Sequence, residues 1–171
     1  MMRLMVRTLL FAGAISMGWL QAAQAAEILY YLTPSKDTPK EKWLQVKTPE
    51  GDTMIVAAEP VARVSSDEIK SARIEREEVE VLDEDDPVSE IYRVRFGLDE
   101  TADAKLARTM DELCKTKPGV HIVVDGVAID YRPFVQCGKF EAAVSFLDKA
   151  SAEQFAHKFA KDVSIATPSK N

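Results

Sequence analysis

The stretch VHIVVDGVAIDYRPFV, residues 120–135, decides how the second half of the chain folds. Its two apolar, β-branched runs are separated by the pair Asp125 and Gly126. Asp-Gly is a preferred pair for a type I′ hairpin turn, in which both central residues have positive φ. We therefore predict an antiparallel hairpin with Asp125 and Gly126 as its structural turn. The alternative is a catalytic Asp125, but a general acid or base also needs a second titratable group nearby, and the sequence marks none.

Regular patterns continue on both sides of this hairpin. The segment 90–98 alternates apolar and charged residues and predicts a half-buried strand. Asp99 can then cap a helix from about residue 100 to residue 115. Residues 139–147 alternate again, and Ser151 is expected to open a final helix. The first strand is expected to place Tyr92, Val94, Phe96 and Leu98 on one face, with Arg93 and Arg95 on the other.

The second half, residues 90–171, thus has the order strand, helix, strand, strand, strand, helix. This order predicts an α+β fold in which two helices pack on one face of a mostly antiparallel sheet, ferredoxin-like in character. The first half, residues 26–89, offers apolar runs at 27–32 and 52–61, which predict short strands joined by a polar loop. Both halves are expected to form a single domain.

A smaller signal in the first half comes from Ser65 and Glu68. A serine followed three residues later by glutamate is the signature of a capping box. We expect a short helical turn at this point.

The first 25 residues have the pattern of a secretory signal peptide. Two arginines precede an apolar run over residues 9–20, which is shorter than the roughly 20 residues that span a bilayer. Small residues two apart then predict cleavage after Ala25. We expect residues 26–171 to be periplasmic and not membrane-embedded, with a retained membrane anchor as the alternative.

Charge argues against a nucleic-acid partner. The chain has 22 Lys and Arg against 28 Asp and Glu; the signal contains two of the arginines and no acid, so 20 basic residues remain and the net charge is −8. A protein that neutralises phosphates shows a basic stripe, whereas the local charge runs here are acidic or mixed. The remaining length, 171 minus 25 or about 146 residues, suits one domain.

The hairpin register bears on the two cysteines. A two-residue turn pairs Val124 with Val127 and sets Val120 opposite Tyr131. Continuing the count brings position 137 level with position 114, although Lys-Pro-Gly at 117–119 reverses the chain between the helix and the hairpin.

We therefore expect both sulfur atoms at the same end of the sheet. In an exported chain with only two cysteines, a disulfide between Cys114 and Cys137 is the prediction. Two buried free thiols are the alternative.

The order of three segments in the second half points to a known family. The segments are VRFGLDETADAKLARTMDEL (94–113), the hairpin stretch and AAVSFLDKASAEQFAHKFAK (142–161). Together they resemble the head region of the first periplasmic domain of SecD, the accessory subunit of the Sec protein-export machinery. The first half is similar too, in ILYYLTP (28–34), MIVAAEPV (54–61) and SSDEIKSARI (65–74).

The resemblance implies a fold and contact with unfolded or exported polypeptide, and it carries over no catalytic residue. Family members are polytopic membrane proteins whose ion-coupled action depends on transmembrane segments, which this sequence does not show after its signal. The link VQCGK (135–139) is also shorter than the glycine-rich link that the family often has.

The function expected from these features is a non-enzymatic periplasmic interaction module. Its expected partner is an exported polypeptide or an envelope protein, with Sec components among the candidates. A sheet edge can accept an extended peptide by strand addition, because main-chain hydrogen bonds tolerate many sequences. The alternative is an envelope enzyme or enzyme inhibitor on the same small fold.

Other side-chain groups favour structural roles. The acidic run 83–86 lacks the spacing of a calcium loop, and a solvated loop is the simpler interpretation. His121 and His157 could form a zinc site or a nucleophile pair with the cysteines, but the spacings match no finger pattern. No G-x-S-x-G elbow or glycine-rich phosphate loop is present. The sequence thus predicts no catalytic, metal-binding or cofactor-binding residue.

Overall fold

The structure is a computed structural model that describes residues 25–80 and 88–166. The expected signal peptide, apart from Ala25, and the acidic run 83–86 lie outside these residues. Ten strands, two α-helices and a short 3-10 helix, η1 (Lys40–Lys42), form the described part. The protein is therefore an α+β protein, as the sequence predicts.

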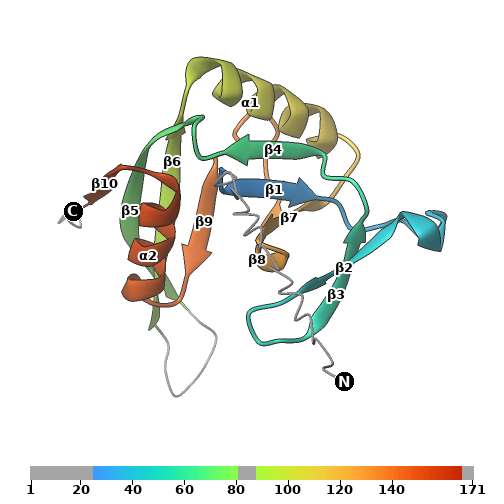
Figure 1. The fold of residues 1–171 in the computed structure, drawn as a ribbon, viewed down its shortest axis with the longest axis horizontal. Coiled ribbons are helices and arrows are strands. Elements are labelled where there is room, and N and C mark those ends of the chain that lie inside the picture. The colour runs from blue at the N-terminus through green and yellow to red at the C-terminus, as the bar shows by residue number, and fades with distance from the viewer. Residues whose placement is uncertain (1–24, 81–87, 167–171) are drawn as a thin grey trace, which may run out of the picture.

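The strands form two sheets (Figure 1). The six-stranded sheet has the order β3-β2-β8-β7-β1-β4 and contains β1 (Glu27–Tyr31), β2 (Trp43–Lys47), β3 (Thr53–Ala57), β4 (Ala62–Ser65), β7 (Gly119–Val124) and β8 (Val127–Pro133). The four-stranded sheet has the order β10-β5-β6-β9 and contains β5 (Ile69–Glu80), β6 (Val88–Leu98), β9 (Ala143–Phe146) and β10 (Asp162–Ile165). The helices are α1 (Glu100–Cys114) and α2 (Lys149–Phe159). Strand pairs are antiparallel except β10 with β5 and β2 with β8.

The expectation of two helices on one face of a single sheet is wrong. Helix α2 packs on β5, β6 and β9, whereas α1 contacts β4 of the other sheet (Figure 1). The reason is pairing between the two halves of the sequence. Strand β6 pairs with β5 from the first half, and β7 pairs with β1, so the second half does not build a sheet of its own.

One buried apolar cluster joins both sheets and both helices. It contains Tyr30 and Ile122 from the six-stranded sheet, Val94 from the four-stranded sheet, Leu106 from α1 and Ala156 from α2. A smaller cluster lies on the other face of the six-stranded sheet and consists of Tyr31, Val46, Val56, Val123 and Ala128. Because the main cluster draws on both halves of the chain, neither half has a separate core.

The helix starts differ in how well the sequence predicts them. Asp99 caps α1 as expected, and its Oδ1 accepts a hydrogen bond from the Ala102 N–H at 2.8 Å. Helix α2 begins earlier than expected because Asp148 is its cap, accepting from the Ser151 N–H at 2.8 Å. Ser151 therefore lies inside the helix and does not open it.

The segment at Ser65 and Glu68 is a single hydrogen-bonded turn, in which the Glu68 N–H donates to the Ser65 carbonyl at 3.0 Å, and no helix follows it. The Glu68 carboxylate accepts from the Ser65 N–H at 2.7 Å and from its hydroxyl at 2.9 Å. The chain then enters β5 directly at Ile69. The short strands β2, β4 and β10 are further elements that the sequence pattern did not reveal.

The β7–β8 hairpin has the turn that the sequence indicates. Asp125 has a φ of 51° and Gly126 a φ of 78°, the positive values that a type I′ turn requires. Val124 pairs with Val127 across it.

Further from the turn the register changes by one residue. The cause is a bulge in β8, where Ile129 is the extra residue between the pairs Val123–Ala128 and Ile122–Asp130. Val120 consequently pairs with Arg132 and not with Tyr131 as expected. One extra residue moves alternate side chains to the opposite face of a strand. Asp130, now paired with Ile122, and Arg132 therefore turn toward the main apolar cluster and toward β9.

Candidate interaction site at the sheet edges

The outer strands of the two sheets are β3 and β4 in one and β9 and β10 in the other. An edge strand presents unpaired backbone N–H and C=O groups and can pair with another chain unless it is covered or capped. Each of the four edges therefore shows whether the fold leaves room for a partner.

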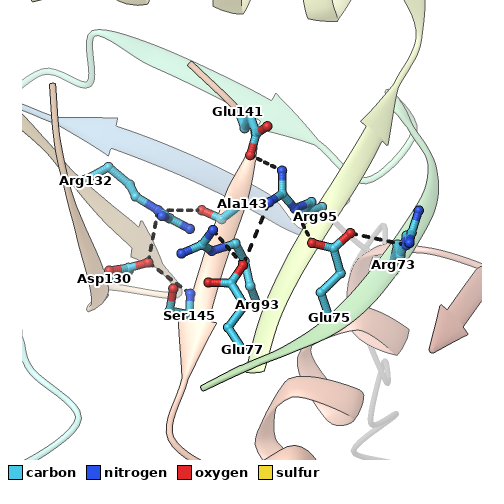
Figure 2. A network of polar contacts seen from close by, with 10 residues as sticks. All are labelled: Arg73, Glu75, Glu77, Arg93, Arg95, Asp130, Arg132, Glu141, Ala143 and Ser145. Carbon is cyan, nitrogen blue, oxygen red and sulfur yellow. Dashed lines mark hydrogen bonds and ion pairs between the residues drawn. The ribbon is translucent and has the colours of Figure 1, made fainter. Parts of the chain in front are cut away.

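The β9 edge is capped by side chains of β8. Phe96 N–H donates to the Ala142 carbonyl, so alternate β9 residues bond to β6 and Ala143 and Ser145 present their backbone groups outward. Arg132 Nε donates to the Ala143 carbonyl at 3.1 Å, and the Ser145 N–H donates to Asp130 Oδ2 at 3.0 Å (Figure 2). Two charged side chains thus replace the missing strand.

These two capping residues also pair with each other. Arg132 Nε lies 3.3 Å from Asp130 Oδ2, and their side chains are only 21% and 17% exposed. Burial lowers the pKa of the Arg132 guanidinium, while the Asp130 carboxylate acts in the opposite direction. An arginine nevertheless stays charged in proteins, so the pair is ionic.

The face of β5 and β6 opposite the one packed on α2 carries further ion pairs, most of them half-buried (Figure 2). Arg73 lies directly opposite Arg95, and Glu75 bridges them, with Oε1 3.2 Å from Arg73 Nε and Oε2 2.7 Å from Arg95 Nε. Arg93 Nη1 lies 2.8 Å from Glu77 Oε1. Each of these carboxylates has a guanidinium partner, and the Glu75–Arg95 and Glu77–Arg93 pairs connect β5 with β6.

The outer edge of β3 is open at Thr53 and Ile55, whereas the outward N–H of Ala57 donates to the Leu32 carbonyl at 2.9 Å. Ala58 N–H donates to the Lys42 carbonyl and Thr48 N–H to the Asp52 carbonyl, which directs the even-numbered residues of β3 toward β2. The backbone groups of Thr53 and Ile55 therefore point outward. Within the described residues, β3 pairs only with β2.

Side chains around this edge are compatible with a partner strand. Strand β3 has the sequence TMIVA and contains no charged residue. Ile55 is 40% exposed, and Leu44 on the neighbouring β2 is 38% exposed. Charged residues commonly protect exposed edges, and this edge lacks them along its own length.

The remaining two edges are less accessible or less suitable. Helix α1 contacts β4 and lies beyond it, on the side away from β1 (Figure 1). Strand β10 is only four residues long and begins with Asp162. Its edge is open in the described part of the chain, with Ile165 exposed. Strand β3 is therefore the best candidate for strand addition, and β10 serves as its comparison.

The turn residues and cysteines expected from the sequence have defined contacts. The Asp125 carboxylate forms an ion pair with Lys158 of α2, a contact that the sequence did not indicate. Cys114 and Cys137 form a disulfide with their Cα atoms 5.6 Å apart. This bond attaches the end of α1 to the loop between β8 and β9.

The contacts of His121 do not involve the disulfide-bonded cysteines. His121 Nε2 and Thr33 Oγ1 are hydrogen-bonded at 2.9 Å, and the imidazole packs 4.8 Å from the Tyr131 ring. Burial lowers the pKa of His121. His157 lies in α2, and over residues 25–80 and 88–166 the structure has no group of three metal-ligating side chains.

Comparisons with known proteins leave the family open. The sequence matches no protein-family model, and no curated protein is found to match it. Among the described residues, no helix has the length and apolar character needed to cross a membrane.

Sequence reasoning missed the residues that distinguish these edges. Asp130 and Arg132 stand two apart in a strand, which indicates only that they share a face. Which face they share depends on the bulge after Ile122, and the strands they reach depend on the sheet order. Ile55 lies in a run that was expected to form a strand, but nothing local indicates that its strand lies at an edge.

Proposed function

We propose that the protein is an exported, periplasmic, non-enzymatic interaction module that binds an extended segment of an exported or unfolded polypeptide. The segment would add as a strand to the outer edge of β3. The observation that carries this proposal is the outward-facing backbone of Thr53 and Ile55 on an uncharged edge strand. Main-chain hydrogen bonds would supply affinity for many sequences, as suits a partner without one fixed sequence.

Other features are consistent with this role. A disulfide is typical of proteins in oxidising compartments such as the periplasm, so the Cys114–Cys137 bond suits export. The resemblance to the SecD head supplies the choice of partner, namely polypeptide passing through the Sec machinery. The ferredoxin-like character enters the proposal only as the order of elements along the chain, because the strands separate into two sheets.

The experiment uses the protein purified after export and an unfolded, cysteine-alkylated model polypeptide with a fluorescent label. Binding is followed by anisotropy, and hydrogen exchange locates the protected amides. Ile55→Pro removes an outward N–H and leaves the β2 hydrogen bonds in place, since proline is tolerated where the N–H faces solvent. We expect this substitution to weaken binding about tenfold, equivalent to one lost hydrogen bond or slightly more.

Ile165→Pro is the matched control, because it makes the same change at the outer edge of β10. In parallel β10, Ala166 N–H donates to the Ile74 carbonyl, so the Ile165 N–H points away from β5. This variant should bind the polypeptide like the unaltered protein. Equal weakening by both prolines, or protection of amides away from β3, would contradict strand addition at this edge.

A further inference from the structure

A cavity of about 290 Å³ lies between the second half of α1 and the loop that joins β8 to β9. Its lining includes Met110 and Cys114 from α1, Arg132 from the end of β8, and Phe134, Cys137 and Phe140 from the loop. It shares no lining residue with the β3 edge. The volume is near the lower end of that of small-molecule sites.

We propose that this cavity binds a small carboxylate that carries one apolar group. The carboxylate would bind the Arg132 guanidinium, and the apolar group would pack among Met110, Phe134 and Phe140. This inference does not depend on the proposed strand addition.

Arg132 has spare hydrogen-bonding capacity at its terminal nitrogens. Its Nε is used by the Ala143 carbonyl and by Asp130. Neither Nη1 nor Nη2 has an acceptor among the described residues, and Nη2 is buried. Hydrogen bonds from a guanidinium to a carboxylate are charge-assisted, and burial strengthens them. A carboxylate in the cavity would bond to Nη1, because protein atoms cover Nη2.

The other wall is apolar and held in place. The Phe134 and Phe140 rings lie 6.1 Å apart, and Phe140 packs edge-on against the buried Tyr30. Met110 is fully buried below them. The Cys114–Cys137 disulfide fixes the loop that covers the cavity, so a ligand would not have to order that loop.

Acidic side chains at the cavity do not leave it negative. Asp111 lies 3.9 Å from Lys115, and Glu141 forms an ion pair with Arg95. Lys139 adds a positive charge to the lining. The balance of charge is compatible with an anionic ligand beside Arg132.

The test compares two ligands on the disulfide-bonded protein by ¹⁵N-edited NMR. The probe is N-acetyl-L-phenylalanine, and the control is N-acetyl-L-phenylalaninamide, which has the same shape without the carboxylate. We expect the acid to shift amide signals of residues 132–141 saturably, with a dissociation constant of about 1 mM or lower. The amide should bind at least tenfold more weakly.

Two substitutions complete the test. Arg132→Gln should weaken binding of the acid at least tenfold, whereas Arg108→Gln, at an exposed arginine of α1 outside the cavity, should leave it unchanged. Because Arg132 also caps β9, the Arg132→Gln variant can fail to fold. In that case the comparison of the acid with the amide on the unaltered protein tests the proposal. Equal binding of acid and amide, shifts located away from the cavity, or no saturable shift would overturn the proposal. Ile55→Pro should bind the acid normally, which separates this site from the β3 edge.

Discussion

The edge strands β9 and β3 differ in whether their outward backbone groups have hydrogen-bond partners. At β9, Asp130 and Arg132 reach from the other sheet and bond to the backbone of Ala143 and Ser145. At β3, the backbone of Ile55 points outward, and no described strand pairs with it. One edge is closed by charge, and the other is open and apolar.

The difference shows that edge exposure in this fold is selective. Closing β9 places two ionisable side chains in a largely buried position, which costs free energy unless their hydrogen bonds are made. At β9 the fold makes the bonds of Arg132 Nε and Asp130 Oδ2. Strand β3 has no charged residue, and among its outward groups only the Ala57 N–H is bonded, to the Leu32 carbonyl. An edge left in this state is the natural candidate for a binding surface.

The largest expected effect comes from the disulfide next to the closed edge. The Cys114→Ser, Cys137→Ser double variant releases the loop that leads into β9, a loop closed over a sequence separation of 23. The chain-entropy model predicts a loss of about 3 kcal/mol in the free energy of unfolding, less any strain in the native bond. Urea denaturation measures this loss.

Reduction of the unaltered protein is the control for that variant and should cause a similar loss. Binding of unfolded polypeptide at β3 should persist as long as the reduced protein is folded. The cavity that the disulfide borders has no lining residue from β3. Unchanged stability after verified reduction would contradict the role assigned to the bond.

The next effect is expected at the cap itself. Asp130→Ala removes the acceptor of the Ser145 N–H and the partner of Arg132, and should lower stability by about 2 kcal/mol. Asp130→Asn keeps one oxygen acceptor and should lose about 1 kcal/mol. Hydrogen exchange gives a direct readout, because the Ser145 amide should be protected in the unaltered protein and exchange faster in both variants.

Asp111→Ala is the control for these variants, since its exposed pair with Lys115 at 3.9 Å should contribute about 0.5 kcal/mol or less. The Ile55 amide, which has no partner strand, should exchange rapidly in every variant. An Asp130→Ala protein as stable as Asp111→Ala would mean that the cap does not hold β9.

Local chemistry accounts for what the sequence could predict. Positive φ at Asp125 and Gly126 needs only the pair itself, and the Asp99 cap needs only the helix that follows it. The alternation that buries Val94 and Phe96 and places half-buried Arg93 and Arg95 on the other face of β6 likewise depends on one strand alone. These features depend on residues close in sequence.

Long-range pairing accounts for what the sequence could not predict. The two sheets arise because β6 pairs with β5 and β7 pairs with β1. No local sequence pattern predicts these pairings. Strict alternation in β8 with Val120 opposite Tyr131 would have turned Asp130 away from β9, and the bulge reverses this. The candidate site could not be found from sequence because an edge exists only once the strand order is known.

The smallest effects are expected at the Asp125–Gly126 turn, which joins β7 to β8. Gly126 has a φ of 78° and no atom within 4 Å of an added Cβ, so the cost of Gly126→Val is expected to be mainly conformational, about 1 kcal/mol or more. Because Lys47 N–H donates to the Gly126 carbonyl at 3.1 Å, strain there should also loosen the β2–β3 hairpin and weaken polypeptide binding.

Asp125→Asn separates the turn from its carboxylate. Asn-Gly forms the same type I′ turn, so the backbone should be unchanged. The substitution removes only the ion pair with Lys158, whose side chains are 37% and 67% exposed for Lys158 and Asp125, and such a pair contributes about 0.5 kcal/mol or less. Stability and polypeptide binding should both stay close to those of the unaltered protein, as measured by urea denaturation and anisotropy. A folded Asp125→Asn protein that bound polypeptide as poorly as Gly126→Val would instead assign the carboxylate a direct role in binding, because the turn would be intact and only the charge would differ.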